Sequence, residues 1–256
     1  MMAVSGQNVV PLTRSVLSDE TYLVLRAMLL EHKIAPGERI NILSLASGLR
    51  VSPTPVREAL ARLESDGLVV KAAMRGYSAS ALLSAREFVE LSQFRALIEP
   101  WNAEQAAKTI DERSAAAINA EIESAEAILA AGGEEGGYAA LTEHDARFHS
   151  LIAQIAGNEL IIQSLERTHF HLHFLRLYMA SRTLAPALPN GAGDVSATFS
   201  EYYRAGNSSR ALDEHRAIAQ AIVEGRSADA AALIREHIES SQRRFEPVVA
   251  ALAGGR

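Results

Sequence analysis

The sequence predicts a mainly α-helical protein in two parts: three short helices with a small β-hairpin, then an all-α antiparallel helical bundle. Alanine and leucine dominate the 256 residues and aromatic residues make up only 5%, a composition that favours helices over sheets. From residue 84 onward the apolar residues recur with helical spacing. A hydrophobic content of 48% suits packed cores, and the length allows two domains.

The N-terminal part is predicted to cover residues 18–80. A periodic apolar segment at 19–32 stops at the helix-breaking residues of "APGER", and "ILSLASGL" predicts a second short helix. The third helix starts in "SPTPVREALARLESDG" and ends at its glycine. In "LVVKAAMRGYSASAL", two β-prone runs surround a turn at Arg75-Gly76, which predicts the hairpin.

The C-terminal part is predicted to contain only helices, between residues 84 and 252. Gly-rich, Gly-Asn and Pro/Gly segments separate six helical patterns, at 84–108, 111–131, 138–156, 158–182, 207–224 and 227–251. The segment 184–200 is the least regular and is expected to be a loop, a lid or a disordered connection. Residues 1–17 are expected to form a flexible N-terminal arm.

Composition and charge exclude several classes of protein. The absence of cysteine rules out disulfides, thiolate zinc sites and a cysteine nucleophile. No signal peptide and no membrane-length apolar run is visible, so we expect a cytoplasmic protein without membrane contact. The net charge is −6, but residues 1–80 carry nine Lys/Arg against seven Asp/Glu. Residues 1–80, with their net positive charge, are therefore the better candidate for binding a polyanion.

Helix, short turn, second helix and hairpin is the plan of a winged helix-turn-helix, in which the second helix of the pair reads the DNA major groove. Basic residues lie before and on that helix and in the hairpin, and hydroxyls with free amides stand at the helix start, where Ser52 or Thr54 serves as N-cap. A small helical subdomain with solvated arginines is the alternative. The candidate DNA-binding residues are Arg39, Arg50, Ser52, Thr54, Arg57, Arg62, Arg75 and Gly76.

The segment from "LRAMLLEHKIAPGERI" through "VSPTPVREALARLESDGLVV" to "RGYSAS" resembles the winged-helix domain of GntR-family bacterial transcription regulators. The resemblance implies that Thr54 and Arg57 contact DNA from the recognition helix and that Arg75 and Gly76 do so from the wing. The family usually has a basic residue where this sequence has Pro53, so the operator sequence of relatives does not carry over.

Two histidines and a carboxylate-histidine pair point to the interior of the bundle. Asp145 and His149 are four residues apart on one helical face, which suits a surface hydrogen bond, an acid/base dyad or half of a metal site. His215 and His237 lie at similar distances from a turn at Gly225 and on the apolar faces of two antiparallel helices. A third helix could add the Asp/His pair, as in metal sites of bundle cores.

The motifs "FRALIEPWNAEQAA", "HDARFHSLIAQIAGNELI" and "EHRAIAQAIVEGRSADAAALIREHI" resemble the FCD ligand-binding domain of the FadR class within the GntR family. This resemblance implies a divalent metal on Asp145, His149, His215 and His237, and a small carboxylate effector. Three imidazoles and a carboxylate favour zinc, with nickel, manganese, cobalt or iron(II) as alternatives. The candidate effector-binding residues are Arg95, for which an ion pair with Glu99 is the alternative, His173 and Tyr178.

These features predict a ligand-responsive transcription regulator, not an enzyme, that binds a palindromic double-stranded operator as a homodimer. One alternative is a metal-independent FadR-like sensor of a larger acyl ligand. Another is an all-helical metal-dependent hydrolase, because His144-Asp145 matches the adjacent pair of such enzymes. That signature is incomplete, since no histidine occurs between His32 and His144.

Overall fold

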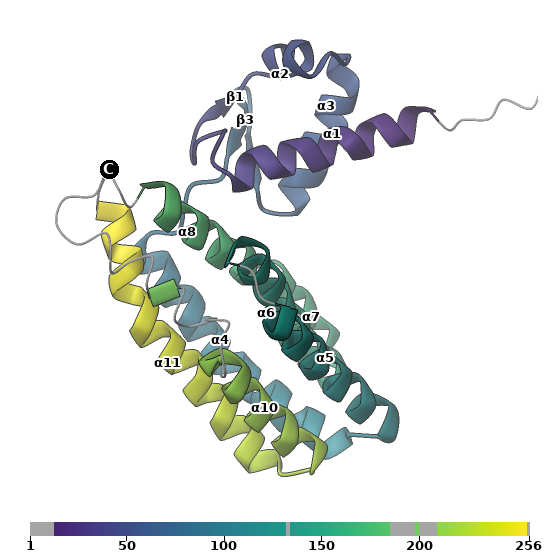
Figure 1. The fold of residues 1–256 in the computed structure, drawn as a ribbon, viewed down its shortest axis with the longest axis vertical. Helices are drawn as coiled ribbons and strands as arrows, with labels where there is room; N and C mark the ends of the chain where they lie inside the picture. The colour runs from purple at the N-terminus through teal and green to yellow at the C-terminus, as the bar shows by residue number, and fades with distance from the viewer. Residues whose placement is uncertain (1–12, 132–133, 185–197, 200–208, 255–256) are drawn as a thin grey trace, which may run out of the picture. The chain divides into compact units, whose positions relative to one another are not determined.

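The computed structural model describes residues 13–131, 134–184, 198–199 and 209–254. The chain divides into two compact units between Ala81 and Leu82, and each is described by itself. The first unit combines three helices with a three-stranded sheet, and the second is helical throughout its described part (Figure 1). The predicted fold class, a mainly α protein with a winged helix-turn-helix and a helical C-terminal domain, is confirmed.

The first helix, α1 (Thr13–Leu30), begins within the segment predicted as an arm. Residues 13–17 of that segment are helical, and residues 1–12 lie outside the described part of the chain. Residues 13–30 contain neither glycine nor proline, so nothing in this segment interrupts the helix. On its inner face Leu25 and Leu29 are buried, and α1 packs on α3.

The helix pair of the first unit consists of α2 (Ile42–Leu49) and α3 (Pro53–Ser65). Asn41 caps α2, because its side chain accepts hydrogen bonds from the amides of Leu43 and Ser44. Ser52 is the N-cap residue of α3, although its hydroxyl makes no capping hydrogen bond. On α3, Val56, Leu60 and Leu63 face the core and are fully buried.

The predicted hairpin is present as β2 (Val69–Ala72) and β3 (Gly76–Ala79). A third strand, β1 (Arg39–Ile40), pairs antiparallel with β3 and was not predicted. The order in the sheet is β1-β3-β2, with Lys71 opposite Tyr77 in the hairpin. A strand of two residues is too short to show an alternation in the sequence.

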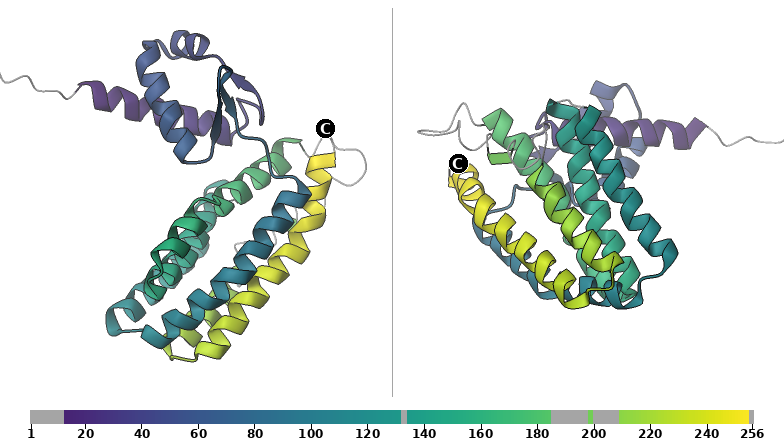
Figure 2. Two further views of the ribbon diagram at one scale, coloured as in Figure 1. Left: turned by 180° about the vertical axis from the view of Figure 1, so that it is seen from behind. Right: turned by 60° about the horizontal axis from the view of Figure 1, so that its bottom comes forward.

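The second unit is built around α4 (Ala85–Thr109), α5 (Glu112–Ala131), α6 (Glu134–Ala156), α10 (Arg210–Val223) and α11 (Ser227–Gly254). Ser84 and Glu87 start α4 with a complete capping box. Helices α4 and α11 run side by side, and α10 folds back on α11 (Figure 2). In the described part of the chain no helix is long and apolar enough to span a membrane.

Pro100 stands inside α4, where proline removes the hydrogen bond to the carbonyl four residues earlier. That carbonyl belongs to Ala96, and it accepts a hydrogen bond of 2.9 Å from Nη1 of Arg235 on α11. The proline therefore creates an acceptor that the neighbouring helix uses, and the bond links the two longest helices of the bundle.

The single helix predicted at 158–182 is wrong, because the structure has α7 (Glu159–Glu166) and α8 (Phe170–Leu184). His169 lies between them with φ +47, a left-handed conformation that ends a helix. Neither glycine nor proline marks this break in the sequence. Asn158 caps α7, because its side chain accepts a hydrogen bond from the amide of Ile161. Most of the predicted irregular segment 184–200 lies outside the described residues.

Candidate functional site

The turn between α10 and α11 sets the level at which the two late histidines face each other. Gly225 has φ +70, and the next amide, of Arg226, bonds back to the carbonyl of Ala221 at 2.8 Å. This left-handed end of α10 reverses the chain directly into α11. His215 and His237 then stand at matching heights on antiparallel helices, as their distances from the turn predicted.

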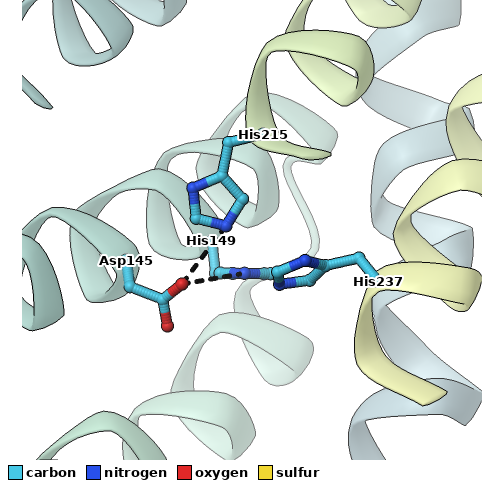
Figure 3. A group of neighbouring side chains, drawn as sticks. All are labelled: Asp145, His149, His215 and His237. Atoms are coloured by element: carbon cyan, nitrogen blue, oxygen red, sulfur yellow. Dashed lines mark ion pairs between the residues drawn. The ribbon is translucent and has the colours of Figure 1, made fainter. Parts of the chain in front are cut away.

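Four side chains converge in the core of the bundle: Asp145 and His149 from α6, His215 from α10 and His237 from α11 (Figure 3). One possible ligand atom from each lies within 4.8 Å of all the others. All four residues are buried, with His215 at 0% exposed surface. Asp145 Oδ1 is 3.2 Å from Nε2 of His215 and 3.9 Å from Nε2 of His149. The residues that the sequence singled out are thus brought together.

The outer ring nitrogen of each histidine already has a partner. Nδ1 of His149 pairs with Oε2 of Glu99, and Nδ1 of His237 lies 2.8 Å from Oε2 of Glu214. Nδ1 of His215 is 3.0 Å from Nε2 of His144. Since each outer nitrogen is engaged, the inner Nε2 atoms are the ones left to face the cluster. Metal-binding histidines are oriented in this way.

Each outer carboxylate is in turn neutralised by an arginine. Arg95 forms a buried ion pair with Glu99, in which its Nη2 lies 3.4 Å from Oε2. The corresponding N–O distances are 2.9 Å from Arg147 to Glu121, which contacts His144, and 3.0 Å from Arg210 to Glu214. Asp145 is the carboxylate that faces the inner nitrogens of the three histidines.

The electrostatic environment favours the protonation states that a metal requires. Burial lowers the pKa of His149 to about 4, and burial also holds the pKa of His215 well below its usual range. Burial by itself would raise the pKa of the Asp145 carboxyl, but the neighbouring imidazoles, His171 first, outweigh it and lower that pKa. Near neutral pH, His149 and His215 therefore offer unprotonated imidazole nitrogens, and Asp145 offers an ionised carboxylate.

The inner nitrogens lack the hydrogen bonds that a polar core would supply. Nε2 of His149 and Nε2 of His215 are buried and have no hydrogen-bond partner, although both face the Asp145 carboxylate. Buried polar atoms without partners are rare in folded proteins. A cation among these atoms would satisfy all of them at once, so the donor set fits a divalent metal. Three imidazoles and one carboxylate suit zinc and its first-row neighbours better than calcium.

Two of the predicted effector-binding residues, Arg95 and Tyr178, make contacts with protein side chains. Arg95 makes the ion pair with Glu99 that was its alternative, and its guanidinium stacks 4.1 Å over the ring of Phe170. Tyr178 stacks on Tyr138 with ring centroids 3.5 Å apart. The role of each in effector binding remains a prediction.

His173 lies near charged groups rather than at the cluster. Burial, with Arg176 and His169 nearby, lowers its pKa to about 4. The histidine of α8 that does reach the cluster is His171, whose Nε2 lies 2.9 Å from Oδ2 of Asp145. The effector-binding role of His173 likewise remains a prediction.

Sequence reasoning missed the partners of the candidate metal-binding histidines. His144, which suggested a hydrolase, has one nitrogen on Glu121 and the other on His215, so neither faces the cluster as a free ligand. Glu214 directly precedes His215, yet it contacts His237 on the next helix. No spacing along the chain indicates such contacts, because they depend on which helices are neighbours.

The candidate DNA-binding residues are all solvent-exposed in the first unit. Arg39 donates a hydrogen bond of 2.9 Å to the carbonyl of Arg75, which ties β1 to the turn of the hairpin. Arg62 packs back on α1, where it lies 2.5 Å from Asp19 and stacks 4.2 Å over the ring of Tyr22. Arg57 stands exposed on α3, so among the α3 arginines it is the better candidate for a DNA contact.

A winged helix-turn-helix unit followed by an all-helical domain defines the class of two-domain transcription regulators. The family model for bacterial regulatory proteins of the gntR family matches residues 17–78, and the model of the FCD domain matches residues 90–240. The chain therefore belongs to the GntR family of transcription regulators and carries a C-terminal FCD domain.

Relatives and solved structures agree with this assignment. The chain is 30% identical over 156 residues to an uncharacterized HTH-type transcriptional regulator, YdhC, of Bacillus subtilis (strain 168), covering 61% of this chain and 68% of the relative. It is 30% identical over 151 residues to the Nta operon transcriptional regulator of Aminobacter aminovorans, covering 58% and 68%.

A putative transcriptional regulator GntR from Rhodococcus sp. RHA1 has a TM-score of 0.59 at 19% identity, over 89% of this chain and 96% of that one. E. coli McbR/YncC has a TM-score of 0.57 at 16% identity, over 88% and 94%. At these identities the two structures show the fold alone.

Proposed function

We propose that this GntR-family regulator binds a palindromic DNA operator as a homodimer and responds to a small organic acid held at a divalent metal in its FCD domain. The observation that carries the proposal is the buried set of Asp145, His149, His215 and His237, whose possible ligand atoms lie within 4.8 Å of one another. These four residues are the proposed metal ligands, with zinc as the preferred ion.

The charges around the site favour an anionic effector. A divalent ion with the single charge of Asp145 and three neutral imidazoles leaves a net positive charge in a buried site. The outer carboxylates do not remove this charge, since Glu99, Glu121 and Glu214 each pair with an arginine. If the bound ion is six-coordinate, the four protein ligands leave two positions, which suit the two oxygens of a carboxylate. Buried charge attracts a counter-charge, so a small organic acid fits better than a neutral ligand.

DNA binding is assigned to the first unit. The proposed contacts are Thr54 and Arg57 at the start of α3, together with Arg75 and Gly76 at the hairpin, all of them exposed. Ser52 and the first amides of α3 are placed to bind phosphate, because a helix N-terminus attracts anions. In a dimer, two α3 helices would read half-sites about one helical turn apart.

A thermal-shift screen of small organic acids, run with zinc and again with a chelator, tests the metal and the effector together. We expect zinc to raise the melting temperature, and one class of acid to raise it further only when zinc is present. An acid that stabilises equally with chelator would support the metal-independent sensor instead. A protein with no bound zinc after dialysis, and no shift on adding it, would refute the metal site.

The regulatory step is tested by titrating operator DNA with and without the acid found in that screen. If the acid alters operator affinity by some factor, DNA must alter the affinity for the acid by the same factor. An acid that binds at the metal and leaves operator affinity unchanged would refute its role as effector, although not the metal site itself.

A further inference from the structure

His144 connects the proposed ligand His215 to a carboxylate on a different helix. Nε2 of His144, on α6, lies 3.0 Å from Nδ1 of His215 on α10. Nδ1 of the same ring lies 2.8 Å from Oε1 of Glu121 on α5. The His144 side chain is 2% exposed. For His149 and His237 a glutamate contacts the ring directly, so His215 alone among the three has an imidazole between its ring and the carboxylate.

The hydrogen bonds from His215 through His144 to Glu121 form one series, and both of its ends require the same ring nitrogens to carry the protons. At the inner end, His215 can bind a metal through Nε2 only if that atom is unprotonated, so the proton of the neutral ring lies on Nδ1. Nδ1 then donates to Nε2 of His144, whose own proton must lie on Nδ1. At the outer end the ionised carboxylate of Glu121 can only accept, which again requires the His144 proton on Nδ1.

The opposite hydrogen-bond direction, from His144 to His215, would place two acceptors against each other at Glu121. If His144 carried its proton on Nε2 and donated to His215, its Nδ1 lone pair would face the Glu121 oxygen at 2.8 Å. Two acceptors at that distance repel each other in a region with little water. With a neutral His144 ring, Glu121 therefore selects the His215 tautomer that leaves Nε2 free for a metal, although Glu121 contacts His144 and not His215.

We propose that His144 and Glu121 are positioning residues of the metal centre: they fix the proton of His215 on Nδ1 and keep its Nε2 lone pair on the metal. The proposal rests on the metal site of the proposed function. Phe148 supports the same ring, since it stacks on His215 with centroids 4.4 Å apart. The last member of this series of contacts is Arg147, which lies 2.9 Å from Oε1 of Glu121 and is half exposed. Through it, metal affinity depends on the contact between α5 and α6.

The test compares zinc affinity, measured by competition with a fluorescent chelator, in three variants. His144→Leu removes both hydrogen bonds and should weaken zinc binding by about 10–100-fold, the usual effect of losing such an outer partner. His144→Gln can still accept the proton of His215 and should recover part of the loss. Glu121→Gln keeps an acceptor for His144 but removes the charge, so it should lie between wild type and His144→Leu.

Glu126→Gln is the matched control. Glu126 is also on α5 and also pairs with an arginine, Arg216 of α10, at 2.8 Å. This variant breaks an ion pair between helices without touching the histidines, so its zinc affinity should equal that of wild type. An equal loss in Glu126→Gln and Glu121→Gln would show that helix packing, not proton placement, sets the affinity, and would overturn the proposal.

Nitrogen-15 NMR of histidine side chains in zinc-loaded wild type reads the protons directly and needs no variant. We expect His144 to be protonated on Nδ1 and not on Nε2, and the opposite tautomer would overturn the proposal even if His144→Leu failed to fold. Wild type that binds no zinc would refute the metal site. If folded His144→Leu binds zinc as tightly as wild type does, the role of His144 is refuted but the metal site is not.

Discussion

Asp145→Asn is the substitution that tests the metal ligands most directly. It keeps the size of a residue that is only 5% exposed, but removes the charge that faces His149 and His215 at 3.9 and 3.2 Å. Four-ligand zinc sites are worth about 10–16 kcal/mol in folding, or roughly 3 kcal/mol for each ligand. A loss of about 2.7 kcal/mol corresponds to a zinc affinity about 100-fold weaker.

The same free energy appears in thermal stability. At a fixed zinc concentration above both dissociation constants, a 100-fold weaker site stabilises the folded protein by about 2.7 kcal/mol less. For a domain of this size each kcal/mol shifts the midpoint by about 2–4 °C. The zinc-dependent shift should therefore shrink by about 5–10 °C in Asp145→Asn, measured by scanning fluorimetry with zinc and with chelator.

Asp111→Asn provides the matched control for this measurement. Asp111 is exposed, and its side chain accepts a hydrogen bond of 2.7 Å from the amide of Ser114 at the start of α5. Asparagine caps helices as well as aspartate does, so this variant should keep the full zinc-dependent shift. If Asp145→Asn also kept the full shift, the carboxylate would not be a ligand and the assignment of the site would be wrong.

Further predictions concern the DNA-binding unit, the acid sensitivity of the bundle and the turn before α11. Arg57→Ala should weaken operator binding and leave zinc content unchanged, measured by fluorescence anisotropy and metal analysis; loss of zinc would contradict the division of roles between the units. His173 has a pKa lowered to about 4 from 6.5 by burial, so the unfolded chain binds this proton first as the pH falls. Stability should drop by up to about 3 kcal/mol between pH 6.5 and 4, and His173→Gln should flatten urea-unfolding free energies there; an unchanged slope would show that His173 is not buried in its neutral form. Gly225→Ala should cost about 1 kcal/mol, because alanine is strained at φ +70, and an equal midpoint in urea would contradict the left-handed turn.

The sequence predicts those parts of the site that depend on spacing within one helix or across one turn. Asp145 and His149 are one helical turn apart, and His215 and His237 lie at similar distances from a glycine that ends a helix, so helix geometry alone brings each pair to a common level. The break at His169 could not be predicted, because a left-handed histidine carries no signal comparable to glycine or proline.

The partners of the ligands could not be predicted for a different reason. Glu99, Glu121 and Glu214 lie on three helices, and each meets a histidine of another helix. Those contacts follow from the order in which the helices pack, which a periodic apolar pattern does not specify. The arginines show the same limit: Arg62 and Arg57 are alike in sequence, yet only the former is held by Asp19 and Tyr22 of α1.

The position of Asp145 explains why metal and effector would act on more of the bundle than the four ligands. Its Oδ1 faces the ligand histidines, while Oδ2 lies 2.9 Å from Nε2 of His171 on α8. Any ligand that reorients this carboxylate must alter its contact with His171, and therefore changes the free energy of placing α8 against α6. By reciprocity, a state of the protein that moves α8 must change the affinity of the site by the same factor. Because α8 reaches the cluster through a carboxylate that is also a proposed metal ligand, we expect α8 to respond to occupancy more strongly than α4, whose contact runs through the neutralised pair of Arg95 and Glu99.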